Sequence, residues 1–314
     1  MIPTSRRPAD HLLIGGDLPV SRMGFGAMHL TGPGMWGEHP DPEHCVRILR
    51  RAVDLGVTFI DTADAYGPGT NERIIRKALH PYPAGLVIST KGGLLRTGPG
   101  DWTGPSPYVM PLGRPEYLRQ QVELSLANLG VDTIDLYQLH AIDPTVPLDE
   151  QIGVLATLQD QGKIRHIGLS GQPGITVADL DRARALAPIA AVENLYNLAE
   201  RTGTVTLNHA EHHQLAFIPW FPLGHGQLAG CDSPLAPLAD HFDAKPAQLA
   251  LAWLLHVSHA TLPIPGTTSL HHLEQNMRAT DIHLTPGDLD LLTSTIDAAG
   301  LTTWAPPNEI AAHA

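Results

Sequence analysis

The chain has 314 residues, 43% of them hydrophobic, and can therefore bury a large core, either as two ordinary domains or as one closed α/β barrel. A formal net charge of -12, with no run of Lys or Arg, argues against nucleic acids and acidic membrane surfaces as partners and favours a small-molecule role. No long apolar segment is present, and Cys45 and Cys231, the only cysteines, lie too far apart in the sequence to suggest a disulfide framework. We therefore expect a protein of the reducing cytoplasm, neither exported nor membrane-spanning.

The predicted elements begin with residues 11–20, where two apolar runs flank a Gly-Gly-Asp turn. This pattern predicts a hairpin that closes the floor of a barrel. Eight strands follow, predicted at residues 23–28, 57–61, 86–91, 133–140, 164–170, 190–194, 215–220 and 260–265. Amphipathic helices are predicted in the intervals, among them residues 45–55, 114–129, 148–161 and 246–256. Gly56, Gly130 and Gly162 follow three of these helices and suit a left-handed C-terminal cap.

Eight strand–helix units in about 300 residues match a (β/α)₈ TIM barrel, in which each crossover helix makes the next strand parallel. A doubly wound sheet is the alternative, but no GxGxxG follows the first strand. A further capped helix is predicted at residues 284–297. We expect one barrel domain over residues 1–314, with peripheral tails at 1–10 and 301–314. Residues 94–113 form one unusually long predicted loop, rich in Gly and Pro, that overhangs the third strand.

Polar residues stand at the predicted carboxyl ends of successive strands. Asp61 ends the second strand, Lys91 the third and His140 the fourth, while Tyr66 lies in the second loop. Because the working residues of such barrels sit at this end, we expect the four side chains to converge over one mouth. Any one of them alone suits a structural ion pair, a cap or a core histidine, so the hypothesis depends on their coincidence.

Together these residues suit proton transfer to a carbonyl oxygen. A free tyrosine titrates near ~10, which makes it a weak proton donor at neutral pH. An adjacent ammonium favours the phenolate and lowers this pKa, so we predict that Lys91, held by Asp61, tunes Tyr66. His140 could orient the carbonyl or help to relay the proton.

At this point the chain resembles an aldo-keto reductase, from about Arg22 to Asp297. The motifs FIDTADAYG, STK and DLYQLH are similar to that family's signatures after the second, third and fourth strands. The resemblance implies a (β/α)₈ barrel that binds NADPH and reduces aldehydes or ketones to alcohols by hydride transfer. It also implies that Tyr66 is the general acid, Asp61 and Lys91 its tuning pair, and His140 the carbonyl-orienting histidine.

The resemblance extends to residues that would contact the cofactor. Ser170 matches a nicotinamide carboxamide ligand, next to which Gly171 replaces the usual asparagine, and Glu193 stands where glutamine is usual. A carboxylate can still accept from the carboxamide NH₂. The remaining predicted contacts are the stacking aromatic Trp220, the pyrophosphate loop residues Phe221, Leu223, Gly224 and Gln227, and the adenosine-phosphate segment Gly266, Thr267, Thr268, Ser269, His272, Gln275 and Asn276.

The predicted phosphate segment lacks a cation. Relatives often have Lys or Arg where Thr268 and His272 stand, and a cation is what favours a 2′-phosphate over a bare hydroxyl. A helix N-terminus and hydroxyl groups can also bind phosphate. We expect NADPH to be preferred over NADH.

The expected substrate is a small-molecule carbonyl in a pocket walled by Met28, Trp36, Trp102 and Tyr108, which favour a flat or aromatic compound. The short phosphate segment also resembles that of relatives that reduce pyridoxal. Two alternatives remain open: an NADPH-binding regulatory or scaffold subunit with little turnover, and a barrel hydrolase or lyase without nucleotide. The sequence leaves monomer and homo-oligomer undecided.

Three histidines in the segment HAEHH, namely His209, His212 and His213, have the i, i+3 and i, i+4 spacings that can hold a metal on a helix. Neither a carboxylate or cysteine partner nor an HExxH pattern supports such a site. We therefore predict a solvated helix face and no metal site.

Overall fold

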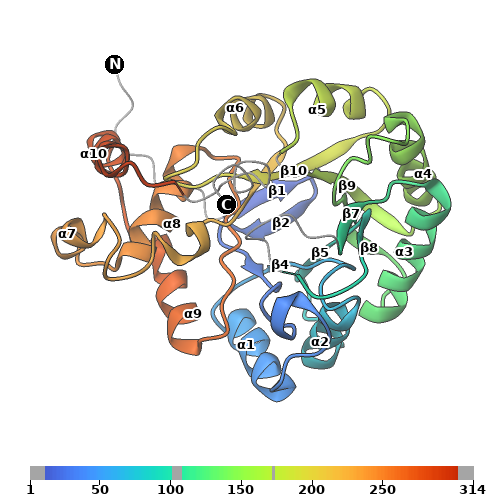
Figure 1. Ribbon diagram of the computed structural model, residues 1–314, viewed down its shortest axis with the longest axis horizontal. Helices are drawn as coiled ribbons and strands as arrows, with labels where there is room; N and C mark the ends of the chain where they lie inside the picture. The colour runs from blue at the N-terminus through green and yellow to red at the C-terminus, as the bar shows by residue number, and fades with distance from the viewer. Residues whose placement is uncertain (1–10, 101–107, 172–173, 303–314) are drawn as a thin grey trace, which may run out of the picture.

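Seven parallel strands curl into the wall of a barrel in a computed structural model, which describes residues 11–100, 108–171 and 174–302 (Figure 1). Their order in the sheet follows the chain, and each pairs in parallel with the next. The strands are β3 (Phe25–Gly26), β4 (Phe59–Asp61), β5 (Val87–Gly92), β8 (Ile134–Leu139), β9 (Ile164–Ser170), β10 (Ile189–Leu195) and β11 (Ala216–Trp220).

The eighth predicted strand closes the barrel but forms only a short bridge. Backbone bonds join it to β11, with Leu262 N donating to Phe217 O at 2.8 Å, and to the first strand, with Gly24 N donating to Pro263 O at 2.9 Å. The predicted strand over residues 260–265 is too long because Pro263 and Pro265 have no N–H to extend the ladder. The predicted (β/α)₈ architecture is confirmed.

The predicted N-terminal hairpin is confirmed as β1 (His11–Ile14) paired antiparallel with β2 (Leu18–Ser21). Its side chains Ile14, Leu18 and Val20 are buried in one cluster with residues that begin the barrel strands, including Phe59 and Ala216. The hairpin therefore closes the amino-terminal end of the barrel, and in Figure 1 it lies inside the ring of helices. The opposite end, where the strands finish, stays open for a site.

Helices surround the sheet, and their apolar faces bury the outer side of the strands (Figure 1). The left-handed backbone of Gly56, Gly130 and Gly162 beyond three of them is confirmed, as is the extra C-terminal helix, which begins with a capping box at Thr285. The helices are α1 (Pro42–Asp54), α2 (Thr70–Leu79), α3 (Pro115–Leu129), α4 (Leu148–Asp160), α5 (Val177–Arg184), α6 (Thr204–His212), α7 (Ala236–Ala239), α8 (Pro246–Val257), α9 (Leu270–Met277) and α10 (Pro286–Ala299), with 3₁₀ turns η1 (Pro33–Met35), η2 (Gly224–Gly226), η3 (Asp240–Phe242) and η4 (Arg278–Asp281).

The long loop predicted at residues 94–113 is partly a β-hairpin. The strands β6 (Leu94–Arg96) and β7 (Val109–Pro111) pair antiparallel at its two ends. The predicted unbroken loop is therefore wrong at its ends, because short runs such as LLR and VMP pair without the longer alternation that marks a strand in the sequence. No helix in the described part of the chain is long and apolar enough to cross a membrane.

Candidate active site

A carboxylate, an ammonium and a phenol meet at the carboxyl ends of β4 and β5. Asp61 is the last residue of β4, Lys91 lies near the end of β5, and Tyr66 lies in the loop after β4. Lys91 Nζ donates to the Asp61 carboxylate and, at 3.1 Å, to the backbone oxygen of Thr62. It lies 5.4 Å from the centroid of the Tyr66 ring. The structure thus brings together three of the side chains that the sequence places at one mouth, and all three are buried.

A second carboxylate, Glu193 of β10, faces the same ammonium. Its Oε1 lies 3.4 Å from Lys91 Nζ, and its Oε2 accepts a hydrogen bond from Gln138 Nε2 at 2.7 Å. From the sequence, Glu193 is predicted only as a cofactor contact. Since β5 and β10 are separated by two strands in the sheet, this contact crosses the barrel interior. No local motif signals such a contact.

The Lys91 ammonium therefore interacts with two buried carboxyl groups, those of Asp61 and Glu193. Burial raises the pKa of Asp61, and burial and the charge of Asp61 raise that of Glu193 to about 8, although Lys91 opposes both shifts. Burial alone would lower the pKa of Lys91, but the two carboxylates raise it, so Lys91 stays charged. Because Glu193 lies farther from the ammonium than Asp61 does, Glu193 is the carboxyl that keeps a proton at neutral pH.

Tyr66 does not have the lowered pKa that the sequence predicts. Burial raises its pKa, and the charge of Lys91 offsets this only in part because Asp61 acts against it, as Glu193 does once it ionises. Lys91 lowers the pKa of Tyr66 as predicted, but the predicted net lowering is wrong because burial outweighs this effect. Tyr66 keeps its proton at neutral pH, so it is available as a hydrogen-bond or proton donor.

His140 lies beside the phenol, directly after β8. Its ring meets that of Tyr66 edge to face with a centroid separation of 5.8 Å. Burial lowers the pKa of His140 well below its usual value, with Lys91 and Arg96 acting in the same direction, so the imidazole is neutral. The buried Nδ1 has no hydrogen-bond partner among the described residues. His140, the fourth predicted side chain, therefore belongs to the cluster, and its Nδ1 is available for a hydrogen bond.

Asp61, Tyr66 and Glu193 border a cleft of about 800 Å³ that extends from the mouth of the barrel to α9, whereas Lys91 and His140 are not among its lining residues. This shape suits an extended ligand with one end at Tyr66 and the other at the N-terminal turns of α9. The predicted site residues that line the cleft are Met28, Asp61, Tyr66, Glu193, Trp220, Phe221, Leu223, Gly266, Thr267, His272, Gln275 and Asn276.

Other predicted cofactor residues lie outside this lining: Ser170, Gly224, Gln227, Thr268 and Ser269. Ser170 is buried at the end of β9, and the hydroxyl of Ser269 caps α9 by accepting from His272 N. Thr268 borders a neighbouring pocket of about 690 Å³.

The predicted aromatic walls are mostly absent from the cleft. Met28 lines it, but Trp36 and Tyr108 do not, and these two side chains are 38% and 45% exposed. Tyr108 packs over Gly98 in the hairpin that replaces the predicted loop. Trp102 lies outside the described residues. Among the described residues, the aromatic surface of the cleft comes instead from Tyr66, Trp220, Phe221 and the histidines.

Several cleft residues are not predicted from the sequence, among them His29, His225 and Lys245. His225 has a left-handed φ of 53° and lies against Phe221, with ring centroids 3.7 Å apart. Lys245 immediately precedes α8 and lines the same cleft as His272 and Gln275. A basic residue at the start of the helix after the seventh strand is a signal that could have identified Lys245.

The sequence matches the aldo/keto reductase family over residues 22–297. The chain belongs to the aldo/keto reductase family. It is thus an oxidoreductase with the barrel of that family. It is 46% identical over 269 residues to an uncharacterised oxidoreductase of Schizosaccharomyces pombe, covering 86% of this chain and 84% of the relative. It is 39% identical over 283 residues to the pyridoxine 4-dehydrogenase of Escherichia coli, covering 88% and 95%.

Solved structures of this family superpose on the whole barrel. The glycerol dehydrogenase of Gluconobacter oxydans matches with a TM-score of 0.83 at 28% identity, covering 93% of this chain and 97% of its own. An aldo-keto reductase from Klebsiella pneumoniae in complex with NADPH matches with a TM-score of 0.75 at 26% identity, covering 93% and 95%. The aldo/keto reductase barrel predicted from the strand-end motifs is therefore confirmed.

Proposed function

We propose that this aldo/keto reductase reduces an aldehyde or ketone to an alcohol with NADPH, and that Tyr66 gives the proton to the carbonyl oxygen. The observation that supports this most directly is the buried contact of Lys91 with Asp61 beside the Tyr66 ring, at the mouth of an extended cleft. A phenol next to an ammonium can release a proton to an oxygen on which negative charge develops.

The residues of the cleft fit a nicotinamide dinucleotide. Trp220 and Phe221 offer aromatic surface near Tyr66, while His272, Gln275 and Asn276 of α9 offer polar groups at the far end. The Klebsiella relative was solved with NADPH. The bound cofactor would supply the hydride.

Lys245 provides the cation that the phosphate segment lacks at positions 268 and 272. It lines the cleft with His272 and Gln275, and Gln248 of the same helix donates to the backbone oxygen of Gln275 at 2.9 Å. We therefore assign the 2′-phosphate preference to Lys245 together with the N-terminal turn of α9.

Side chains of the protein account for proton transfer to the carbonyl oxygen. Neutral His140 and protonated Tyr66 lie side by side, and both can donate to one carbonyl oxygen, which polarises it. As the oxygen gains charge, Tyr66 gives up its proton, and Lys91 stabilises the phenolate that remains. Protonated Glu193 leaves Lys91 neutralised by Asp61 alone.

For the substrate we propose pyridoxal, an aromatic aldehyde. The Escherichia coli relative is named for the chemically related alcohol pyridoxine, and the aromatic side chains of the cleft suit a flat ring. Glycerol dehydrogenase is a structural relative as well, so a small aliphatic carbonyl is the comparison substrate.

Turnover tests the proposal. Purified protein is mixed with NADPH and pyridoxal or glyceraldehyde, and the absorbance of the reduced nicotinamide is followed. We expect Tyr66→Phe to lower kcat by about 10²–10⁴-fold while cofactor affinity, read from tryptophan fluorescence, is kept. Tyr82→Phe is the matched control, since Tyr82 donates to Leu129 O away from the cleft. Tight NADPH binding without turnover of any carbonyl would instead indicate a regulatory subunit.

Cofactor choice is tested separately. We expect Lys245→Met to weaken NADPH binding about tenfold or more and to leave NADH binding unchanged. Lys163→Met removes an equally charged lysine that pairs with Glu123 on the surface, and it controls for net charge. Equal loss of both cofactors in Lys245→Met would contradict the phosphate assignment.

A further inference from the structure

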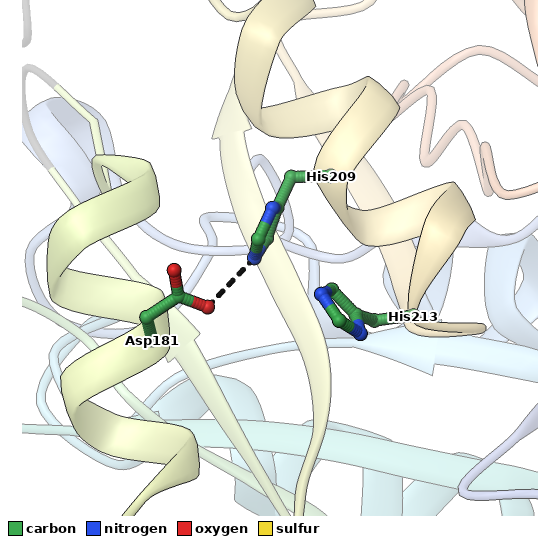
Figure 2. Close-up of side chains that lie close together, drawn as sticks. All are labelled: Asp181, His209 and His213. Atoms are coloured by element: carbon green, nitrogen blue, oxygen red, sulfur yellow. Dashed lines mark hydrogen bonds and ion pairs between the residues drawn. The ribbon is translucent and has the colours of Figure 1, made fainter.

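The histidine segment after β10 has a carboxylate partner on a neighbouring helix. Asp181 of α5 faces His209 in the last turn of α6 and His213, the residue that caps this helix (Figure 2). One ligand atom from each of the three side chains lies within 4.8 Å of the others. The prediction of a bare solvated face assumed that no acidic partner was near, and that premise is wrong because the partner comes from the neighbouring helix.

The three side chains already act together. His209 Nε2 lies 2.8 Å from Asp181 Oδ1, and the rings of His209 and His213 have centroids 4.5 Å apart. A carboxylate oxygen and unprotonated imidazole nitrogens are the ligand atoms that bind metal ions.

A cation already bridges two of these ligands. Arg184 Nη2 donates to His213 Nδ1 at 3.0 Å, and Arg184 Nη1 donates to Asp181 Oδ1 at 3.3 Å. Since a guanidinium can only donate, His213 Nδ1 must present its lone pair to it. The site therefore holds a positive charge with the same atoms that a metal ion would use.

We propose that Asp181, His209 and His213 form a surface site for a borderline divalent cation, Zn²⁺ or a chemical equivalent such as Ni²⁺, that displaces the Arg184 side chain. Two imidazole nitrogens and one carboxylate oxygen suit these ions, with water completing the coordination. Bonds of about 2.1 Å to a tetrahedral ion set the ligand atoms about 3.4 Å apart. The pair at 2.8 Å must open slightly and the most distant pair must close by at most about 1.4 Å, which rotations of these partly exposed side chains achieve.

The ion would link α5 to α6 on the outside of the barrel. These helices are neighbours in the ring around the sheet (Figure 1), and the ion would join them across the connection through β10. Since Asp181 is half exposed, entry of the ion requires only that Arg184 swing outward. We expect the ion to stabilise the fold without changing turnover.

Calorimetric titration of Zn²⁺ into the full chain, purified without a polyhistidine tag, tests the site. We expect one site of micromolar affinity, weakened at least about tenfold in His213→Ala and in Asp181→Asn, and tightened in Arg184→Ala, where the competing cation is gone. His271→Ala, a surface histidine on α9, is the matched control and should bind as the parent does.

Thermal unfolding provides the second measurement, because Zn²⁺ that bridges the two helices must raise the Tm of the parent and of Arg184→Ala but not of Asp181→Asn. Absence of Zn²⁺ binding by Arg184→Ala at millimolar concentration would overturn the proposal. Zn²⁺ binding that is equally strong in Asp181→Asn and His213→Ala would also overturn it, since other histidines would then account for it.

Discussion

Replacing Glu193 by glutamine tests the charge balance at the centre of the site. The substitution keeps the shape and length of the side chain and leaves a carbonyl oxygen to accept from Gln138. It removes only the ability to ionise. Because the folded protein holds Glu193 protonated at neutral pH, whereas the unfolded chain exposes an ordinary carboxylate, the parent loses stability relative to the variant as the pH rises.

The size of this effect follows from the two pKa values. Protonated Glu193 contributes stability fully below its ordinary pKa of 4.5, and this contribution is lost as the pH rises toward its folded value of about 8. At pH 7 the loss covers the interval from 4.5 to 7, which corresponds to about 3 kcal/mol. Any folded pKa above 7 gives the same figure, so the expectation does not depend on the exact value.

Urea unfolding at pH 5, 6 and 7 measures this pH-dependent difference in stability between parent and variant. We expect the free energy of unfolding of Glu193→Gln to gain on the parent by about 1.4 kcal/mol per pH unit. Glu150→Gln, at an exposed position on α4, controls for the loss of one surface charge and should show no such trend. A difference that stays constant with pH, or a variant that loses stability relative to the parent as the pH rises, would refute the assignment of the proton to Glu193.

Three further substitutions probe the scaffold behind the site. Asp64 is buried with no partner for its oxygens among the described residues, and burial raises its pKa well above 3.8. We therefore expect Asp64→Asn to gain stability over the parent as the pH rises above 3.8. Equilibrium unfolding at pH 4, 6 and 8 tests this, and a stability difference that does not change with pH contradicts it. A Cβ at Gly92 would lie 2.0 Å from the Tyr137 hydroxyl, so Gly92→Ala should lower the free energy of unfolding in urea by about 1–3 kcal/mol. Adding Tyr137→Phe to this variant should restore part of the lost stability, and no recovery would mean that the clash lies elsewhere. The buried Arg22 guanidinium donates to three backbone carbonyl oxygens near the last barrel strand, so Arg22→Met should lower the free energy of unfolding by about 3 kcal/mol; a loss below 1 kcal/mol would mean that water replaces these bonds.

The barrel and the Asp61, Tyr66, Lys91 and His140 cluster were predictable because both depend on local patterns. Alternation of strand and helix sets the order of the sheet, and a residue at a strand's carboxyl end must lie at the open mouth. The eighth strand was overextended because apolar character does not reveal that prolines interrupt the ladder. The hairpin in residues 94–111 was missed for the opposite reason, since its strands are too short to show a period.

Contacts between distant strands were not predictable in the same way. Glu193 and Lys91 belong to strands separated by two others, and only the closed barrel brings them to 3.4 Å. Lys245 is likewise separated from the phosphate segment by the whole of α8, and Asp181 comes from a different helix than the histidines it faces. Each of these pairs depends on tertiary packing, which motif spacing does not encode.

The direction of the Tyr66 pKa shift shows how contacts between distant strands affect the chemistry of the site. Considered as a pair, Lys91 and Tyr66 predict a more acidic phenol, whereas burial together with the charge of Asp61 makes it less acidic. The cluster is electrically neutral only while Glu193 keeps its proton, because Asp61 then balances Lys91. Ionisation of Glu193 adds a negative charge that further raises the pKa of Tyr66. The protonation state of Glu193, a residue outside the predicted catalytic four, therefore sets how readily Tyr66 can give its proton away.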